Sequence, residues 1–123
     1  MSKPDPGTRP GPIDRKKLED LRKLERPGNE GFLARIVGVF LADAEKRMRE
    51  IGRGMQAADS EAVALAAHTL KGSCSYVGAT HLSDLCRALE EAADRGTLDA
   101  ARAEEVSREF DQVSAALGAE IGG

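Results

Sequence analysis

The chain has 123 residues, of which 41% are hydrophobic, 32% are charged and only 3% are aromatic. This length fits one compact domain, and the abundance of Ala and Leu favours helices over strands. The net charge of −3 does not suggest nucleic-acid binding, which depends on clustered positive charge. No run approaches the roughly 20 apolar residues that span a bilayer. We therefore expect an all-α protein of the cytoplasm, with no membrane segment and no nucleic-acid partner.

The N-terminal residues 1–12 are rich in proline and glycine and lack the apolar core of a signal peptide. We expect them to form a flexible tail, followed by one helical domain over residues 13–121. Cys74 and Cys86 form no CxxC pair, so we expect them to be reduced core residues. The chain has too few Cys and His residues at useful spacing to predict a metal site.

Apolar residues at intervals of three and four predict five helices, over residues 14–25, 29–55, 60–76, 80–95 and 99–119. Leu18, Leu21 and Leu24 define one side of the first helix, and Asp14 is its expected N-cap. Asp59 or Ser60 is expected to cap the third helix. Short connections make successive helices antiparallel neighbours. The predicted fold is an up-and-down antiparallel four-helix bundle with a short additional N-terminal helix.

One histidine of the third predicted helix lies away from its buried side. At about 100° per residue, His68 points about 150° away from the centre of the apolar stripe. That stripe consists of Val63, Ala66, Ala67, Leu70, Cys74 and Val77. The predicted neighbours of His68 on the outer face are Ala64 and Leu65 one turn before it, and Lys71, Gly72 and Ser75 after it.

The chemistry of this outer face suits a phosphoryl group. A neutral imidazole is a good nucleophile near pH 7, and a lysine three residues later can place its ammonium beside a negative charge. Gly72 costs roughly 1 kcal/mol in a helix interior relative to Ala. It either admits another macromolecule or an anion close to His68, or lets a neighbouring helix pack tightly. An exposed histidine near a lysine is, by itself, usually an ordinary surface feature.

The segment AHTLKGSC at residues 67–74, continued by Val77, Gly78 and Ala79, resembles the histidine-containing phosphotransfer (HPt) domain family of two-component phosphorelays. The family pattern has a histidine, an apolar residue two positions later, Lys-Gly, and a glycine ten positions after the histidine. His68, Leu70, Lys71, Gly72 and Gly78 match it. The clear similarity covers about residues 60–96, and the helix layout is compatible with the family over residues 13–117.

The resemblance implies a role for each matched residue. His68 would accept a phosphoryl group from a phospho-aspartate of a receiver domain and return it to the aspartate of another receiver. Lys71 would neutralise part of the phosphate charge, and Gly72 would leave room for the receiver. Ala64 and Leu65 would dock a receiver helix. The implied partners are response-regulator receivers and a hybrid histidine kinase. The receiver would supply Mg²⁺, because this chain has no acidic cluster beside His68.

Three further polar residues lie near the expected site or resemble its chemistry. Ser75 is close to His68 on the helical wheel and is placed to bond the phosphate. Glu90 stands where family members often carry a polar side chain that approaches the histidine. Its negative charge would repel the phosphate, so we do not expect it to take part. His81, at the start of the fourth helix, is expected to be a surface or capping residue.

Several alternatives remain open at this point. The sequence has no GxxxxGK[ST] phosphate-binding loop, so we expect a phosphoryl carrier without kinase activity of its own. We also expect the chain to be a monomer. It is alternatively the phosphoacceptor domain of a chemotaxis-type histidine kinase, or a docking adaptor that is never phosphorylated. The Pro-rich start after Met1 and the Gly-Gly end fit a small complete protein better than an excised domain. A metal-binding bundle would need inward ligands such as ExxH, which we do not find.

Overall fold

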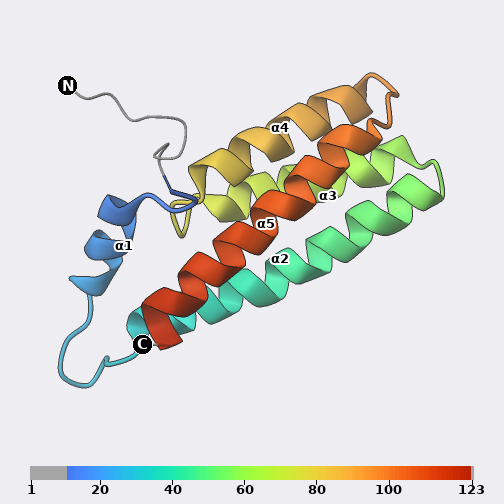
Figure 1. The fold of residues 1–123 in the computed structure, drawn as a ribbon. Coiled ribbons are helices and arrows are strands. Elements are labelled where there is room, and N and C mark those ends of the chain that lie inside the picture. Colours follow the sequence, from blue (N-terminus) through green and yellow to red (C-terminus); the bar gives the residue numbers. More distant parts are fainter. Residues whose placement is uncertain (1–10, 123) are drawn as a thin grey trace, which may run out of the picture.

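The described part of the chain, residues 11–122 of the computed structural model, folds into five α-helices and contains no strand (Figure 1). The helices are α1 (Arg15–Arg22), α2 (Phe32–Gln56), α3 (Ser60–Cys74), α4 (Thr80–Asp94) and α5 (Ala100–Gly122). Helices α2 to α5 run up and down side by side, and α5 also contacts α2, which closes the bundle. The short helix α1 lies at one end. This arrangement confirms the predicted fold. Most of the predicted N-terminal tail lies outside the described residues.

Two aspartates begin helices where the sequence predicts them. The side chain of Asp14 accepts a hydrogen bond of 3.0 Å from the backbone N–H of Lys16 at the start of α1. The side chain of Asp59 accepts one of 3.1 Å from the backbone N–H of Ala62 in α3. Each cap satisfies a backbone donor that has no partner inside its helix.

The structure corrects three of the predicted helix ends. Helix α1 stops at Arg22, so Leu24 falls beyond the C-cap, does not share a helix side with Leu18 and Leu21, and is 47% exposed. The prediction for Leu24 was wrong because it extended the helical spacing past the point where the chain turns. Helix α2 begins at Phe32, after an N-cap at Gly31, and not at Asn29. Helix α5 continues to Gly122, three residues past its predicted end.

A single apolar core fills the space between α2, α3, α4 and α5. The entire predicted stripe of the third helix is buried, and Leu82, Leu89, Val106 and Leu117 meet it from the other helices. A Cβ added to the buried Gly54 would lie 2.7 Å from Cγ2 of Val63. Gly54 therefore allows the close approach of α2 to α3.

The end of the bundle that carries α1 is tied to the turn between α3 and α4. Gly78 in that turn has a φ of +75°, and an added Cβ would lie 2.9 Å from Cβ of Lys17. The backbone N–H of Asp14 donates a 2.8 Å hydrogen bond to the carbonyl of Gly78. Only glycine satisfies both the backbone conformation and the contact. Gly78 thus fixes the end of α3, ten residues after His68.

Ion pairs also attach α1 to the C-terminal end of α5. Nη1 of Arg15 lies 2.6 Å from Oε2 of Glu120 near the end of α5, and Arg22 pairs with the second oxygen of the same carboxylate. Hydrogen bonds from Arg15 and Arg22 lower the pKa of Glu120 below its usual value. The carboxylate of Glu120 therefore joins both ends of α1 to the last turns of α5.

The two cysteines face each other beneath the surface of α3 and α4. Cys74 and Cys86 are free thiols and both are fully buried, which confirms that they are core residues. A hydrogen bond with Cys74, together with burial, raises the pKa of the Cys86 thiol far above its usual value. Because the thiolate is the reactive form, the raised pKa keeps the Cys86 thiol unreactive at neutral pH.

Candidate functional site

His68 projects from α3 on the side opposite the buried stripe, and 62% of its side chain is exposed. The 3.6-residue period of the helix explains this position. The stripe fixes which face of α3 meets the core, and His68 lies on the other face. The predicted exposure of His68 is therefore confirmed.

A carboxylate from the next helix contacts both the histidine and the lysine of the predicted site. Nδ1 of His68 lies 2.8 Å from Oε2 of Glu90, and Nζ of Lys71 donates a 2.8 Å hydrogen bond to Oε1 of Glu90. Only 16% of the Glu90 side chain is exposed, compared with 28% for Lys71. The structure therefore brings His68, Lys71 and Glu90 together across the contact between α3 and α4.

The electrostatics of Glu90 differ from the expectation based on sequence. Burial raises the pKa of Glu90, but hydrogen bonds from Lys71 and His68 outweigh burial and leave the pKa below its usual value. Glu90 is therefore an anion at neutral pH, and the ammonium of Lys71 balances its charge. The position of Glu90 near His68 is therefore confirmed, and its pairing with Lys71 was not part of the repulsion argument.

The contact with Glu90 determines which ring nitrogen of His68 meets a partner. An ionised carboxylate accepts hydrogen bonds and cannot donate them, so a neutral imidazole places its proton on Nδ1 in this arrangement. The lone pair is then on Nε2, which is the nucleophilic atom. The site presents this nitrogen on an exposed helix face, next to a cation.

Gly72 lies one turn after His68 on an open part of the surface. A Cβ added to Gly72 would have no atom within 4 Å. The alternative that Gly72 lets a neighbouring helix pack tightly is therefore wrong, and the surface at Gly72 is open. The hydroxyl of Ser75 donates a 2.9 Å hydrogen bond to the carbonyl of Gly72. Ser75 is exposed, and the structure gives it no contact with His68, Lys71 or Glu90.

The apolar residues predicted beside His68 differ in their surroundings. Ala64 is partly buried and packs against the core, whereas Leu65 is 68% exposed. Beyond Gly72, the exposed apolar surface continues to Tyr76, which is 66% exposed, and across to Val39 of α2, which is 69% exposed. Both residues were missed: Val39 lies on α2, and the sequence argument did not follow the outer side of the predicted third helix beyond Ser75.

Val39 and Tyr76 border a cleft of about 380 Å³ between α2 and α3. Its other lining residues are Ile36, Phe40, Asp43 and Ser73. The hydroxyl of Ser73 donates a 3.2 Å hydrogen bond to Asp43, whose carboxylate also pairs with Arg47 at 3.0 Å. We call this cleft and the exposed residues Leu65 and Gly72 the α2–α3 surface. It is mainly apolar and adjoins His68.

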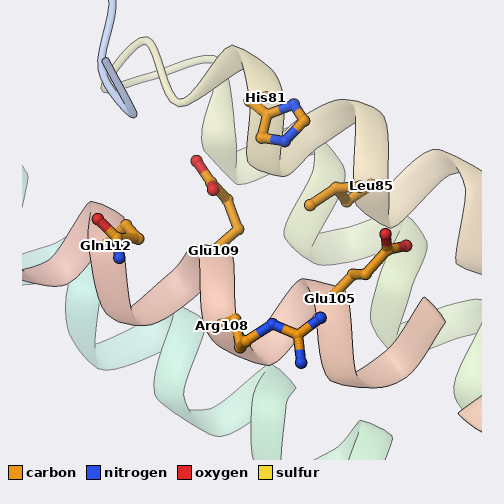
Figure 2. Close-up of a pocket in the computed structure, with 6 residues that line it drawn as sticks. All are labelled: His81, Leu85, Glu105, Arg108, Glu109 and Gln112. Carbon is orange, nitrogen blue, oxygen red and sulfur yellow. The ribbon is translucent and has the colours of Figure 1, made fainter. Parts of the chain in front are cut away.

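The second histidine lies in a different part of the fold. His81 lines an open cleft of about 400 Å³ between α4 and α5, where Glu105, Arg108 and Glu109 project from α5 (Figure 2). Nine residues, or about two and a half helical turns, separate His81 from Glu90, so the two project from opposite sides of α4. The N-cap of α4 is Ala79, so His81 does not cap this helix.

Among residues 11–122, no three His, Cys, Asp or Glu side chains are grouped so that they would hold a metal ion. Within the same part of the chain, none of the helices combines the length and the apolar character needed to cross a membrane.

The helix order defines a helical bundle that presents the exposed His68 beside Lys71 and Glu90, and comparison with known proteins shows the family of this bundle. The family model described as the Hpt domain matches residues 35–116, which include His68, Lys71 and Glu90. The chain belongs to the Hpt domain family.

The chain is also similar to individual proteins of this kind. It is 31% identical over 80 residues to histidine-containing phosphotransfer protein 5 of Arabidopsis thaliana, covering 63% of this chain and 51% of that protein. It is 26% identical over 87 residues to the phosphorelay intermediate protein YPD1 of Candida albicans, covering 71% and 47%. The chain thus spans about half the length of these curated relatives.

A solved structure extends the likeness over nearly the entire fold. The crystal structure of histidine-containing phosphotransfer protein B (HptB) from Pseudomonas aeruginosa PAO1 matches with a TM-score of 0.82 and 30% sequence identity. The match covers 93% of this chain and 97% of that one.

Proposed function

We propose that the chain is a phosphoryl carrier that accepts a phosphoryl group on His68 from the phospho-aspartate of a receiver domain and passes it to the aspartate of another receiver. The observation that carries this proposal is the exposed imidazole of His68, whose Nδ1 lies 2.8 Å from Glu90. Membership of the Hpt domain family supports it. The proposed partners are response-regulator receivers and a hybrid histidine kinase of the cytoplasm, and the chain acts as a monomer.

In the proposed transfer, the lone pair of Nε2 attacks phosphorus and a P–N bond forms. The bond between phosphorus and the aspartyl oxygen breaks, and its electron pair stays on the carboxylate of the receiver. The Lys71 ammonium, three residues from His68, pairs with Glu90 and has further N–H donors for the arriving phosphoryl oxygens. We propose that the receiver holds the Mg²⁺, because oxygen-rich sites are what this ion requires. No nucleotide chemistry is assigned to this chain.

We further propose that the receiver docks on the α2–α3 surface. This surface adjoins His68 and contains three of the large apolar side chains that are exposed in the structure, namely Val39, Leu65 and Tyr76. A group of exposed apolar side chains beside a polar reacting group is typical of a protein-binding site. Gly72 lies within it and keeps the helix backbone accessible.

The test is a transfer assay with purified proteins. A receiver carrying a radioactive phosphoryl group is mixed with the chain and Mg²⁺, and the label on the chain is followed with time. We expect an acid-labile, base-stable label that His68→Gln abolishes and the control His81→Gln preserves, with unchanged helical circular dichroism. A label retained by His68→Gln contradicts the proposal. Receiver binding without labelling of the wild type supports a docking adaptor instead.

A further inference from the structure

We propose that three exposed cations of α2, namely Lys46, Arg49 and Arg53, attract receivers that carry Asp and Glu side chains along one edge of their docking surface, and orient that edge over α2. We call these three residues the α2 basic stripe. This inference rests on the proposed function and adds the charge of the partner, which the apolar side chains of the α2–α3 surface do not define. It starts from the distribution of charge along α2.

The α2 basic stripe lies on the side of α2 that faces away from the core. Its members are three, four and seven residues apart, which is the spacing of one helix face. Val39 lies two turns before Lys46 on the same face and is 69% exposed. Because Val39 belongs to the α2–α3 surface, the α2 basic stripe extends that surface along α2.

Two contacts between α2 and α3 bring the stripe level with the phosphorylation site. Near one end, the hydroxyl of Ser73 donates a 3.2 Å hydrogen bond to Asp43, and further along the backbone of Gly54 packs against Val63. The two helices therefore run beside each other in opposite directions (Figure 1). His68 lies midway between these contacts on α3, and the α2 basic stripe lies between the same contacts on α2.

The charges of the stripe are not neutralised inside the chain. The neighbouring Arg47 is partly buried and pairs with Asp43 at 3.0 Å and with Glu50 at 2.8 Å. Within residues 11–122, by contrast, none of the ion pairs includes a cation of the stripe or the exposed Glu45 beside it. Like charges at these spacings destabilise a helix. A partner with carboxylates at this face relieves the repulsion, whereas a cationic partner increases it.

The opposite flank of the site carries the opposite charge. On α4, Arg87 is neutralised by Asp84 at 2.7 Å, whereas Glu91 and Asp94 are exposed and form no ion pair in the described part of the chain. The exposed Arg95 offsets only one of these two charges. An acidic edge of a receiver is therefore attracted over α2 and repelled over α4. Both effects favour the same orientation of the receiver above the site.

A charged stripe at the border of a docking surface acts mainly on the rate of association. Unpaired surface charges raise the rate at which an oppositely charged partner arrives, while the central apolar contacts hold it after arrival. Salt screens such charges, with a Debye length of about 10 Å at 0.1 M. The contribution of the stripe should therefore be large at low salt and absent at high salt.

The first measurement is the initial rate at which a phosphorylated receiver at limiting concentration labels the full chain. For Lys46→Gln/Arg53→Gln, we expect a rate about tenfold below that of the wild type in roughly 20 mM NaCl, and an equal rate in roughly 0.5 M NaCl. Labelling by phosphoramidate should be unchanged. A rate equal to that of the wild type at low salt, or a loss that persists at high salt, overturns the inference.

A matched control makes the same change of net charge on another helix. Arg102 and Arg108 are exposed on α5, which contacts α2 and α4 but, among the described helices, not α3. Arg102→Gln/Arg108→Gln should therefore label at the rate of the wild type at both salt concentrations. A loss as large as that of the α2 variant would mean that net charge alone sets the rate, which contradicts a role for the stripe.

The second measurement tests the orientation of the receiver. A water-soluble carbodiimide activates a carboxylate so that a lysine ammonium in contact with it, once deprotonated, forms an amide and displaces the urea. We expect cross-links between receiver carboxylates and Lys46, and also residue 53 in the variant Arg53→Lys, but none at residue 108 in Arg108→Lys. Cross-links at residue 108 without any at Lys46 overturn the inference.

The outcomes separate this inference from the proposed function. If no receiver labels the wild type, the proposed function fails and the inference fails with it. If receivers label the wild type and Lys46→Gln/Arg53→Gln equally at low salt, the inference alone fails. Vesicles of phosphatidylglycerol test a lipid surface as the alternative partner. Vesicle binding that Lys46→Gln/Arg53→Gln loses, with no change in its labelling rate, would assign the stripe to lipid and overturn the inference.

Discussion

Substitutions at Gly72 should affect the thermal stability of the protein and its rate of phosphoryl transfer in different ways. It lies inside α3, and an added Cβ would contact nothing within 4 Å. Gly72→Ala should therefore stabilise the protein by about 1 kcal/mol, since alanine is a better helix former and no clash opposes it. For a domain of this size, that gain corresponds to a rise in Tm of about 4 °C. Thermal unfolding followed by circular dichroism measures it.

A larger side chain at the same position should have the opposite effect on transfer. Gly72→Leu places an isobutyl group on the exposed face of α3, one turn from His68, where the receiver is proposed to dock. We expect transfer from a phosphorylated receiver to slow by at least about tenfold, because small displacements of the reacting atoms cost large factors in rate. The fold should remain as stable as that of the wild type or more so.

Gly52 provides a matched control for both substitutions. It is an exposed glycine inside α2, and an added Cβ there also meets nothing within 4 Å. Gly52→Ala and Gly52→Leu should therefore stabilise the helix without slowing transfer. The reasoning is refuted if Gly72→Ala lowers the Tm, or if Gly72→Leu transfers at the rate of Gly52→Leu.

Two further predictions concern the docking surface and the tie between α1 and α5. Val39→Asp and Tyr76→Asp should each slow transfer from a receiver by about tenfold, because each places a charge in the apolar docking surface. Labelling of His68 by the small donor phosphoramidate should be unchanged in both variants, and the exposed control Leu24→Asp should alter neither rate. Equal losses with both donors would contradict the docking surface. Ion pairs lower the pKa of Glu120, so they stabilise the fold at neutral pH and lose this effect as the pH falls through the lowered pKa. Glu120→Gln should therefore lower the Tm at pH 7, and its difference from the wild type should shrink below pH ~4; a difference that is independent of pH would contradict the assignment.

Much of the fold follows from local patterns that a sequence displays directly. The stripe of α3 is fully buried and His68 is exposed, because one helical period determines both. The N-caps at Asp14 and Asp59 depend only on a side chain and its own helix start. Leu24 shows the limit of this reasoning, since a spacing of three residues continues in the sequence after the helix itself has ended.

The candidate site was only partly predictable, because part of it arises between helices. His68, Lys71 and Gly72 lie on one helix, so a wheel places them correctly. Glu90 reaches them from α4, and its charge is acceptable only because Lys71 pairs with it. The sequence argument considered the carboxylate and the phosphate but not this third group. Similarly, the cleft beside Val39 and Tyr76 exists only where α2 and α3 meet.

The central claim is that His68 carries the phosphoryl group on Nε2. The most direct test is nitrogen and phosphorus NMR of the chain after reaction with a phosphorylated receiver and Mg²⁺. The account predicts coupling between phosphorus and Nε2 of His68, with hydrogen retained on Nδ1. A phosphoryl group on Nδ1 of His68, or on His81 or any other residue, would contradict it.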